Sequence, residues 1–319
     1  MRRRRRFVSS RVAALALAVL AVGCSDSPDA TEDRIDALFG DVPFGTVDRG
    51  QVRRMLDVPS ESDRPFYMVN FIHYRAHAEY RDGRETDLTG AQADAVYGSL
   101  VMPILASIGA QIIFVANVET SPIDPDAAGW NQIAVVLYPS RAGFIAMLER
   151  PDFRDAAVHK IAGVERSIVL VTEPSENQFP EELRRVDLSA LPFPPTPSDP
   201  PVNLVHLLEF NERAMYADGR ETDLTGREAM ALYEQGRAPQ AFPLGVRPGL
   251  TLAVEGELIG DGRRWDEFRI NNFPSRAAFA ELTRRESLAA AGYEHREAAL
   301  ADTYAVVAAP LINEVGYIR

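Results

Sequence analysis

Two histidines occur at matching places in the two halves of this sequence. His159 and His295 lie 136 positions apart, and a basic residue follows each of them, Lys160 or Arg296. A histidine beside a base can transfer protons near neutral pH, so His159 and His295 are candidate catalytic residues. The competing interpretation is an exposed helix end, where such pairs are common.

Polar residues interrupt two rows of apolar side chains. Residues 66–74 and 202–210 are rich in β-branched and aromatic residues, which predicts strands. By the alternation of a strand, Asn70 and His206 share a face with large apolar neighbours. A buried polar group needs a partner, either another side chain or a ligand. Asn70 and His206 are therefore candidate ligand-binding residues, and His206 is also a candidate base.

A polar stripe is predicted in only one half of the chain. Glu267, Arg269 and Asn271 alternate along one predicted strand, whereas the matching strand at 132–138 is mainly apolar. The stripe could line a polar pocket. It could equally face solvent, because antiparallel sheets often have one wet face.

The nonapeptide DGRETDLTG occurs twice, at 82–90 and at 218–226. Its arginines, Arg84 and Arg220, could ring the mouth of a pocket with the neighbouring aspartates. A structural interpretation explains more of the motif: Asp-Gly favours a turn, and Thr followed three positions later by Gln or Glu is a capping box that opens a helix.

Metal and cofactor patterns are missing from the sequence. There is no HExxH, Walker loop, GxSxG, or GxGxxG after a predicted strand. None of the five histidines forms an i, i+4 pair on a predicted helix, and the chain has one cysteine. We therefore expect no metal site and no cofactor.

The N-terminus is typical of an exported lipoprotein. Six arginines precede or flank an apolar run at 12–22 that ends next to Cys24, so residues 1–23 are predicted to be a signal peptide. Residues 20–24 (LAVGC) resemble a lipobox, in which Cys24 receives diacylglycerol and palmitate-type acyl chains. This predicts a lipid-anchored protein of the cell envelope, in the outer membrane if the cell has two membranes. The alternative is an ordinary secreted protein.

Charge argues against nucleic acid as a partner. Removal of residues 1–23 leaves 28 basic and 46 acidic residues, a formal charge of about −18. The same charge opposes adsorption on anionic lipids, so membrane attachment should depend on the acyl chains of Cys24.

The order of predicted elements is strand, helix, strand, strand, helix, strand, and it occurs twice. This order is typical of the ferredoxin-like α+β fold, with one open face on its sheet. Two copies could pair within the chain and bury these faces against each other. The predicted boundaries are a lipidated tether at 24–64, a first repeat at 65–174, a Pro-rich linker at 175–201, a second repeat at 202–310 and a tail at 311–319.

The two repeats resemble a known family. The segments NFIHYRAHAEYRDGRETDLTGAQADAVY and HLLEFNERAMYADGRETDLTGREAMALY are each followed by Pro, Gly, Trp, PSR and a His-Lys or His-Arg pair. This pattern is similar to the domain of unknown function 1330 family of the dimeric α/β barrel superfamily. The resemblance implies a ferredoxin-like fold and an intrachain dimeric α/β barrel. It implies no single activity, because the wider superfamily includes oxygenases, haem-degrading enzymes, isomerases and binding proteins.

Three functional hypotheses follow from the sequence. The first is a lipid-anchored envelope protein that binds a small, partly apolar molecule in a pseudo-dimeric barrel. The second is a cofactor-free oxygenase or isomerase with His206 or His295 as its base. The third is a non-catalytic structural module whose pocket is closed by side chains.

Overall fold

The structure of the chain is a computed structural model that describes residues 28–40, 42–120, 129–176, 179–288 and 290–318. The predicted signal peptide and Cys24 lie outside the described residues. Among the helices that the structure describes, none has both the length and the apolar character needed to span a membrane.

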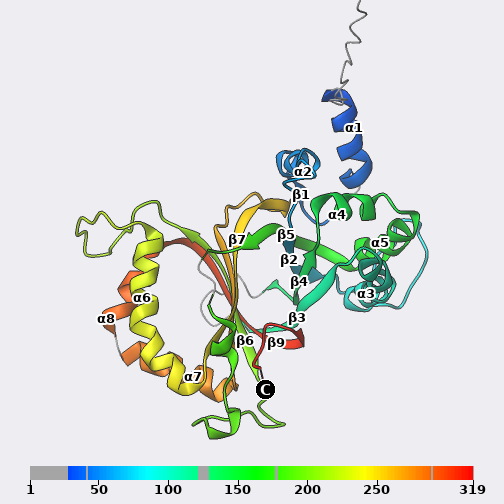
Figure 1. Cartoon of the computed structure of the whole chain (residues 1–319). Helices are drawn as coiled ribbons and strands as arrows, with labels where there is room; N and C mark the ends of the chain where they lie inside the picture. The colour runs from blue at the N-terminus through cyan, green and yellow to red at the C-terminus, as the bar shows by residue number, and fades with distance from the viewer. Residues whose placement is uncertain (1–27, 41, 121–128, 177–178, 289, 319) are drawn as a thin grey trace, which may run out of the picture.

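The strands form one antiparallel sheet that closes on itself (Figure 1). They are β2 (Phe66–Tyr74), β3 (Gln111–Thr120), β4 (Gln132–Tyr138), β5 (Val164–Pro174), β6 (Val202–Phe210), β7 (Arg247–Gly260), β8 (Glu267–Phe273) and β9 (Leu300–Asn313). Their order in space is β7-β5-β2-β4-β3-β9-β6-β8, and β8 pairs again with β7. The pairs β3–β9 and β5–β7 join the two halves of the chain. The molecule is therefore a mixed α+β protein with a barrel-like sheet.

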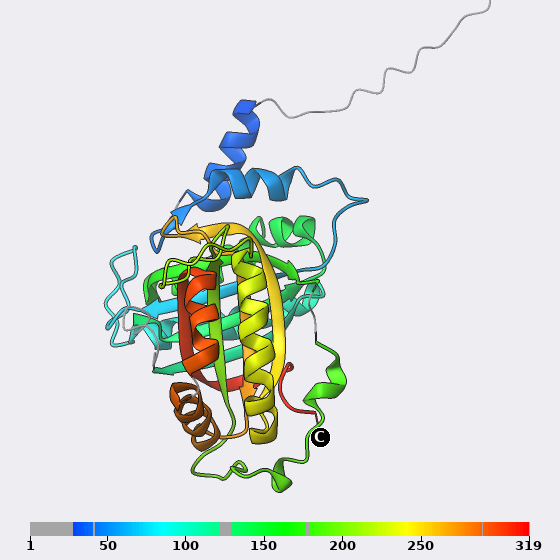
Figure 2. The same cartoon turned by 90° about the vertical axis from the view of Figure 1, so that its left-hand side faces the viewer.

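Helices cover the outside of this sheet. The first half contributes α3 (Gly90–Ser107), α4 (Arg141–Leu148) and α5 (Pro151–Gly163), and the second half contributes α6 (Gly226–Ala241), α7 (Arg276–Leu288) and α8 (Ala290–Ala299). The two groups lie on opposite sides of the sheet in Figure 1, and Figure 2 shows α6 and α8 in front of it. Pro151 begins α5. Its fixed φ suits the first turn of a helix.

The inside of the closed sheet is filled by apolar side chains. A single buried cluster takes residues from all eight strands, including Val69, Phe71, Phe114, Phe268 and Tyr304. The rings of Phe71 and Phe268 have centroids 6.2 Å apart, so the two halves of the chain meet there. These residues belong to the strand faces opposite to Asn70 and His206. The interior of the barrel is thus a core rather than the pocket that we expected between the sheets.

The residues that precede β2 are more ordered than the predicted tether. They form α1 (Pro28–Phe39), β1 (Thr46–Val47) and α2 (Arg49–Leu56). Ile35, Phe44 and Met55 are buried in the core of the first half, and β1 pairs with β7. The sequence predicted a tether here because the apolar residues are few and widely spaced among charged ones.

The strands that join the halves are longer than the sequence predicted. β9 continues to Asn313 and so includes the start of the predicted tail, and β7 is as long as β9, at 14 residues. The linker at 175–201 contains two short 3₁₀ helices, η2 (Glu181–Arg184) and η3 (Leu188–Ala190). Strand length here depends on pairing between distant segments, which local composition does not show.

Candidate ligand-binding site

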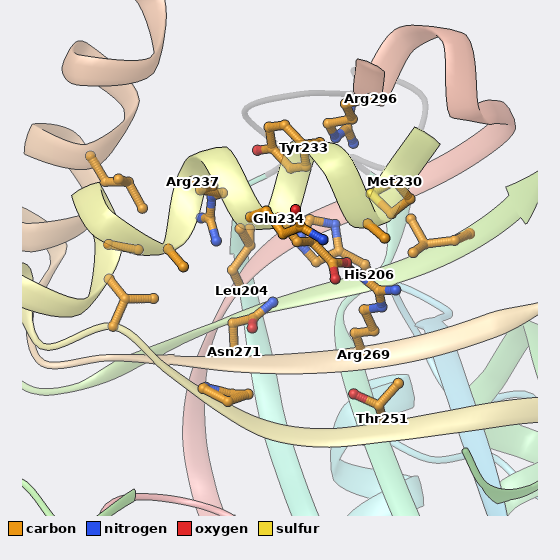
Figure 3. Close-up of a pocket in the computed structure, with 18 of the residues that line it drawn as sticks. Leu204, His206, Met230, Tyr233, Glu234, Arg237, Thr251, Arg269, Asn271 and Arg296 are labelled. Carbon is orange, nitrogen blue, oxygen red and sulfur yellow. Dashed lines mark hydrogen bonds and ion pairs between the residues drawn. The ribbon is translucent and has the colours of Figure 1, made fainter. Parts of the chain in front are cut away.

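A large pocket lies in the second half, between the sheet and the helices α6 and α8. Its volume is about 1270 Å³. Side chains from β6, β8 and α6 converge on this space in Figure 3. The apolar part of the lining includes Leu204, Leu208, Met230, Phe242 and Phe279. A pocket of this size with apolar walls and a few polar groups is the usual form of a small-molecule site.

The local structure explains which side chains face the pocket. Alternation along β6 directs Leu204, His206 and Leu208 toward the helices. On α6, pocket residues recur with helical spacing, and they are Arg227, Met230, Tyr233, Glu234 and Arg237. Because α6 also opens with a complete capping box at Thr225 and Glu228, its first turn is fixed over the sheet.

His206 is a polar group without a partner in the floor of this pocket. Its Nδ1 atom is buried and accepts or donates no hydrogen bond among the described residues. Burial, and then the positive charges of Arg296, Arg237 and Arg269, hold the pKa of His206 well below its ordinary value. The imidazole is therefore neutral at pH 7. Its Nδ1 atom can donate or accept one hydrogen bond with a bound molecule, depending on which ring nitrogen carries the proton.

Arg296 is a second pocket residue with a hydrogen-bond donor that lacks an acceptor among the described residues. It is 7% exposed, and its Nη2 atom is buried without a hydrogen-bond partner among the described residues. Its guanidinium carbon lies 5.8 Å from the centre of the Tyr293 ring on the same helix. A buried guanidinium normally has a bidentate or charged partner, so an enclosed free N–H group indicates space for an acceptor.

The polar stripe of β8 also faces the pocket. Glu267, which is 1% exposed, pairs with Arg269 and with Arg227 (2.8 Å), and Arg269 pairs in addition with Glu234. Asn271 lines the same wall beyond them. The charged residues of the stripe thus form an ion-pair network that joins β8 to α6. A ligand can contact only the side of this network that lines the pocket.

The first half has a corresponding pocket of about 840 Å³. Asn70 lies in its floor at the position that matches His206, and its amide reaches only the carbonyl oxygen of Met68, at 3.5 Å. Leu38 and Phe39 of α1 form part of its wall. The N-terminal helix therefore covers part of this pocket, whereas Phe179 and Leu183, near and within η2, line the pocket of the second half.

A buried acid and a base share the first pocket. Asp94 of α3 is 9% exposed, and its Oδ2 atom accepts a hydrogen bond of 2.9 Å from the Tyr74 hydroxyl. Burial raises the pKa of Asp94, whereas the charge of Lys160 lowers it. Burial lowers the pKa of Lys160, and Asp94 opposes that change. Burial is the larger influence on both groups, so the pKa of Asp94 is raised and that of Lys160 is lowered, and each charge offsets only part of the other's shift.

The remaining sequence candidates hold the two nonapeptide loops in place. The hydroxyl of Tyr80 lies 2.6 Å from His159 Nδ1, and that of Tyr216 lies 2.7 Å from His295 Nδ1. The guanidinium carbons of Arg84 and Arg220 lie 4.1 and 3.7 Å above the centres of the same tyrosine rings. Arg84 lines the first pocket, whereas Arg220 pairs with Asp218 and Glu294 and does not line the second.

Sequence reasoning missed two parts of the site. Arg296 was noted only as the neighbour of His295, yet it is Arg296 that lines the pocket. The helical spacing of Arg227, Met230 and Arg237 could have shown that α6 contributes a wall. Among the residues that the structure describes, no group of three or more His, Cys, Asp or Glu side chains could hold a metal ion.

Comparisons with known proteins find similar solved structures. No protein-family model and no curated protein matches the chain. The methylated RPA0582 protein, described as a protein of unknown function from Rhodopseudomonas palustris, is 31% identical over 42% of this chain and 98% of that chain, with a TM-score of 0.37. A mutant chlorite dismutase from Candidatus Nitrospira defluvii is 11% identical over 81% of this chain and 95% of that chain, with a TM-score of 0.41.

The chain's own topology defines its class. It is an α+β protein in which eight antiparallel strands close a barrel-like sheet, with helices outside the sheet and a pocket beneath the helices of each half. The larger pocket contains two of the buried polar atoms that lack partners among the described residues, Nδ1 of His206 and Nη2 of Arg296, and the smaller pocket is lined by Asp94, whose Oδ1 is another.

Proposed function

We propose that this protein binds a small, partly apolar molecule in the pocket between β6, β8, α6 and α8. The observation that carries the proposal is His206, a neutral imidazole whose buried Nδ1 has no partner among the described residues and lines a pocket of about 1270 Å³. An unused buried polar atom costs about 1–3 kcal/mol, and a ligand that pairs with it recovers that cost. The pocket's volume favours binding over a module closed by its own side chains.

A second part of the proposal concerns how the two halves of the chain are related. We propose that residues 65–174 and 202–310 are tandem ferredoxin-like repeats that pair as an intrachain dimeric α/β barrel, in keeping with the resemblance to the domain of unknown function 1330 family. The matching order of elements and the two joining strand pairs support it. In this arrangement each half keeps one pocket on its helical side.

Native mass spectrometry of gently purified protein tests the binding function. A retained molecule should appear as a mass excess that is lost on denaturation. Ala238→Trp, on the wall of the second-half pocket, should remove the excess, whereas Ala157→Trp, on the wall of the first-half pocket, should leave it unchanged. Loss of the mass excess in Ala157→Trp alone would place the ligand in the first-half pocket and contradict the proposal. A wild-type protein without any mass excess would also contradict it.

A second candidate function is a cofactor-free oxygenase or isomerase with His206 as the base. Its neutral state and free Nδ1 favour this candidate, since a general base must be unprotonated and within reach of its substrate. If the retained molecule is a substrate, His206→Gln should abolish its turnover and still permit binding. Equal turnover by His206→Gln would rule out this enzyme.

We further propose that the protein is attached to the cell envelope through lipid on Cys24. Three residues separate Cys24 from the start of α1, so even a fully extended connection spans roughly 14 Å. The folded body would then lie close to the membrane surface. Cys24→Ser should move the protein from the membrane fraction to the soluble fraction, and unchanged membrane association would contradict lipidation.

A further inference from the structure

One of the differences between the two pockets removes a buried acid from the second half. Asp94 of α3 and Met230 of α6 are equivalent, 136 positions apart, and both line their pockets. Lys160 and Arg296 are equivalent in the same way. The first half therefore has a half-buried base and a buried acid, and the second half has a buried base and, in place of the acid, a thioether that is 3% exposed.

The other acids of the second pocket are already used or directed elsewhere. Glu234 and Glu267 pair with Arg269, and Glu294 pairs with Arg220 at 3.1 Å. Glu297 is exposed, and adjacent residues on a helix do not face each other. Among the described side chains, none forms an ion pair with Arg296.

We infer that the molecule bound in the second pocket carries a carboxylate, which Arg296 and His206 bind from above and from the floor, beside Met230. This inference rests on the proposed binding function and specifies the ligand's chemical class. The carboxylate occupies the part of the second pocket where the first half has the acid Asp94. Arg296 Nη2 donates to one of its oxygens, and a neutral His206 that carries its proton on Nδ1 donates to it as well.

The remaining surfaces of the pocket specify the rest of the molecule. Leu204 and Leu208, which flank His206 on one face of β6, and Phe279 offer apolar contacts. Removal of the ligand's apolar part from water would supply most of the binding free energy, and the charged contact would supply selectivity. The inferred ligand class is an apolar acid, such as a medium-chain or aromatic carboxylic acid.

Isothermal titration calorimetry with octanoate, octanamide and octylamine at pH 7 tests the inference. These probes share one apolar chain and differ in charge and in hydrogen bonding at the end. The wild-type protein should bind octanoate at least about tenfold more tightly than octanamide, because hydrogen bonds to charged groups contribute about 1.5–3 kcal/mol. Arg296→Met should reduce this preference to about twofold or less, and Arg296→Lys should restore part of it.

Two further variants replace Met230 and test the comparison with the equivalent Asp94 of the first pocket. Met230→Asp introduces the acid of the first half, so it should abolish octanoate binding and retain octanamide binding. Met230→Asn is the neutral control of the same shape and should keep the preference for octanoate. If either variant does not fold, the Arg296 series still decides the matter.

The outcomes separate the inference from the proposed function. Equal affinities for octanoate and octanamide in the wild-type protein would overturn the inference and leave binding intact. If no probe binds, the molecule retained in native mass spectrometry decides: an acid supports the inference, and a neutral or basic molecule overturns it. If no probe binds and no molecule is retained, both proposals fail.

Discussion

At the scale of single residues, the site is defined by polar atoms that the fold encloses without pairing. His206 stands in an apolar strand face, and its imidazole is kept neutral by burial and by three arginines. Such an arrangement lowers stability when the ligand is absent, because a desolvated group contributes no compensating hydrogen bond. We interpret this cost as the mark of a binding residue, since a purely structural position would tolerate an apolar side chain.

The depressed pKa of His206 predicts a pH dependence of stability. Between its folded pKa and its ordinary value near 6.5, the unfolded chain binds more protons than the folded one, so stability falls as pH falls through this window. The slope contributed by one such group is at most about 1.4 kcal/mol per pH unit. The charged groups that face His206 are Arg269 and Glu267 from β8, Arg237 and Glu234 from α6, and Arg296 from α8.

Urea unfolding of wild-type protein and His206→Gln between pH 7 and pH 5 measures this effect. The unfolding free energy of wild type should decline more steeply with falling pH than that of the variant. The other histidines are present in both proteins and cancel in the difference. Parallel declines would show that His206 is not held neutral in the folded state.

At the scale of elements, α1 and α2 are integral to the first half rather than a tether. Met55 of α2 is 2% exposed within the core of that half. Met55→Ala should therefore cost about 2–5 kcal/mol of unfolding free energy. Met102→Ala in α3 is a matched control, because Met102 is 55% exposed and should contribute little. Equal effects of the two substitutions, measured by chemical unfolding, would restore the interpretation of a tether.

The repeated nonapeptide was the most predictable element. The turn and both capping boxes are present as the sequence indicated, with Thr89 and Thr225 each accepting a hydrogen bond of 3.2 Å from the N3 backbone. Local chemistry sets these features, so one sequence suffices to predict them. Thr89→Ala and Thr225→Ala should each cost about 1 kcal/mol of unfolding free energy, whereas Thr→Ser at either position should cost less. No measurable loss in either alanine variant would contradict the capping role.

At the scale of the whole molecule, the closed sheet makes the two halves one folding unit. Phe71 of the first half packs against Phe268 and Tyr304 of the second, inside the barrel. Phe71→Ala should cost about 3–5 kcal/mol and lower the stability of both halves in one cooperative transition. Calorimetric unfolding in two steps, with only the first step shifted, would show instead that the halves fold separately.

The sequence predicted the order of elements well and the location of the pocket poorly. Alternation placed Asn70 and His206 at corresponding positions on the same face of their two strands, and each does lie on that face, opposite to the buried residues of the barrel. It could not show whether that face turned toward the other half or toward the helices, because both surroundings are apolar. Pairing of β3 with β9 and β5 with β7 decides the question, and these contacts join residues far apart in the chain.

A crystal structure of the protein in complex with octanoate shows whether an acid binds between Arg296 and His206. One octanoate should lie in the second-half pocket, with its carboxylate within hydrogen-bond distance of Arg296 Nη2 and His206 Nδ1 and its chain against one of the leucines that flank His206, Leu204 or Leu208. Octanoate bound inside the closed sheet or in the first-half pocket, with the carboxylate away from Arg296 and His206, would contradict the inference.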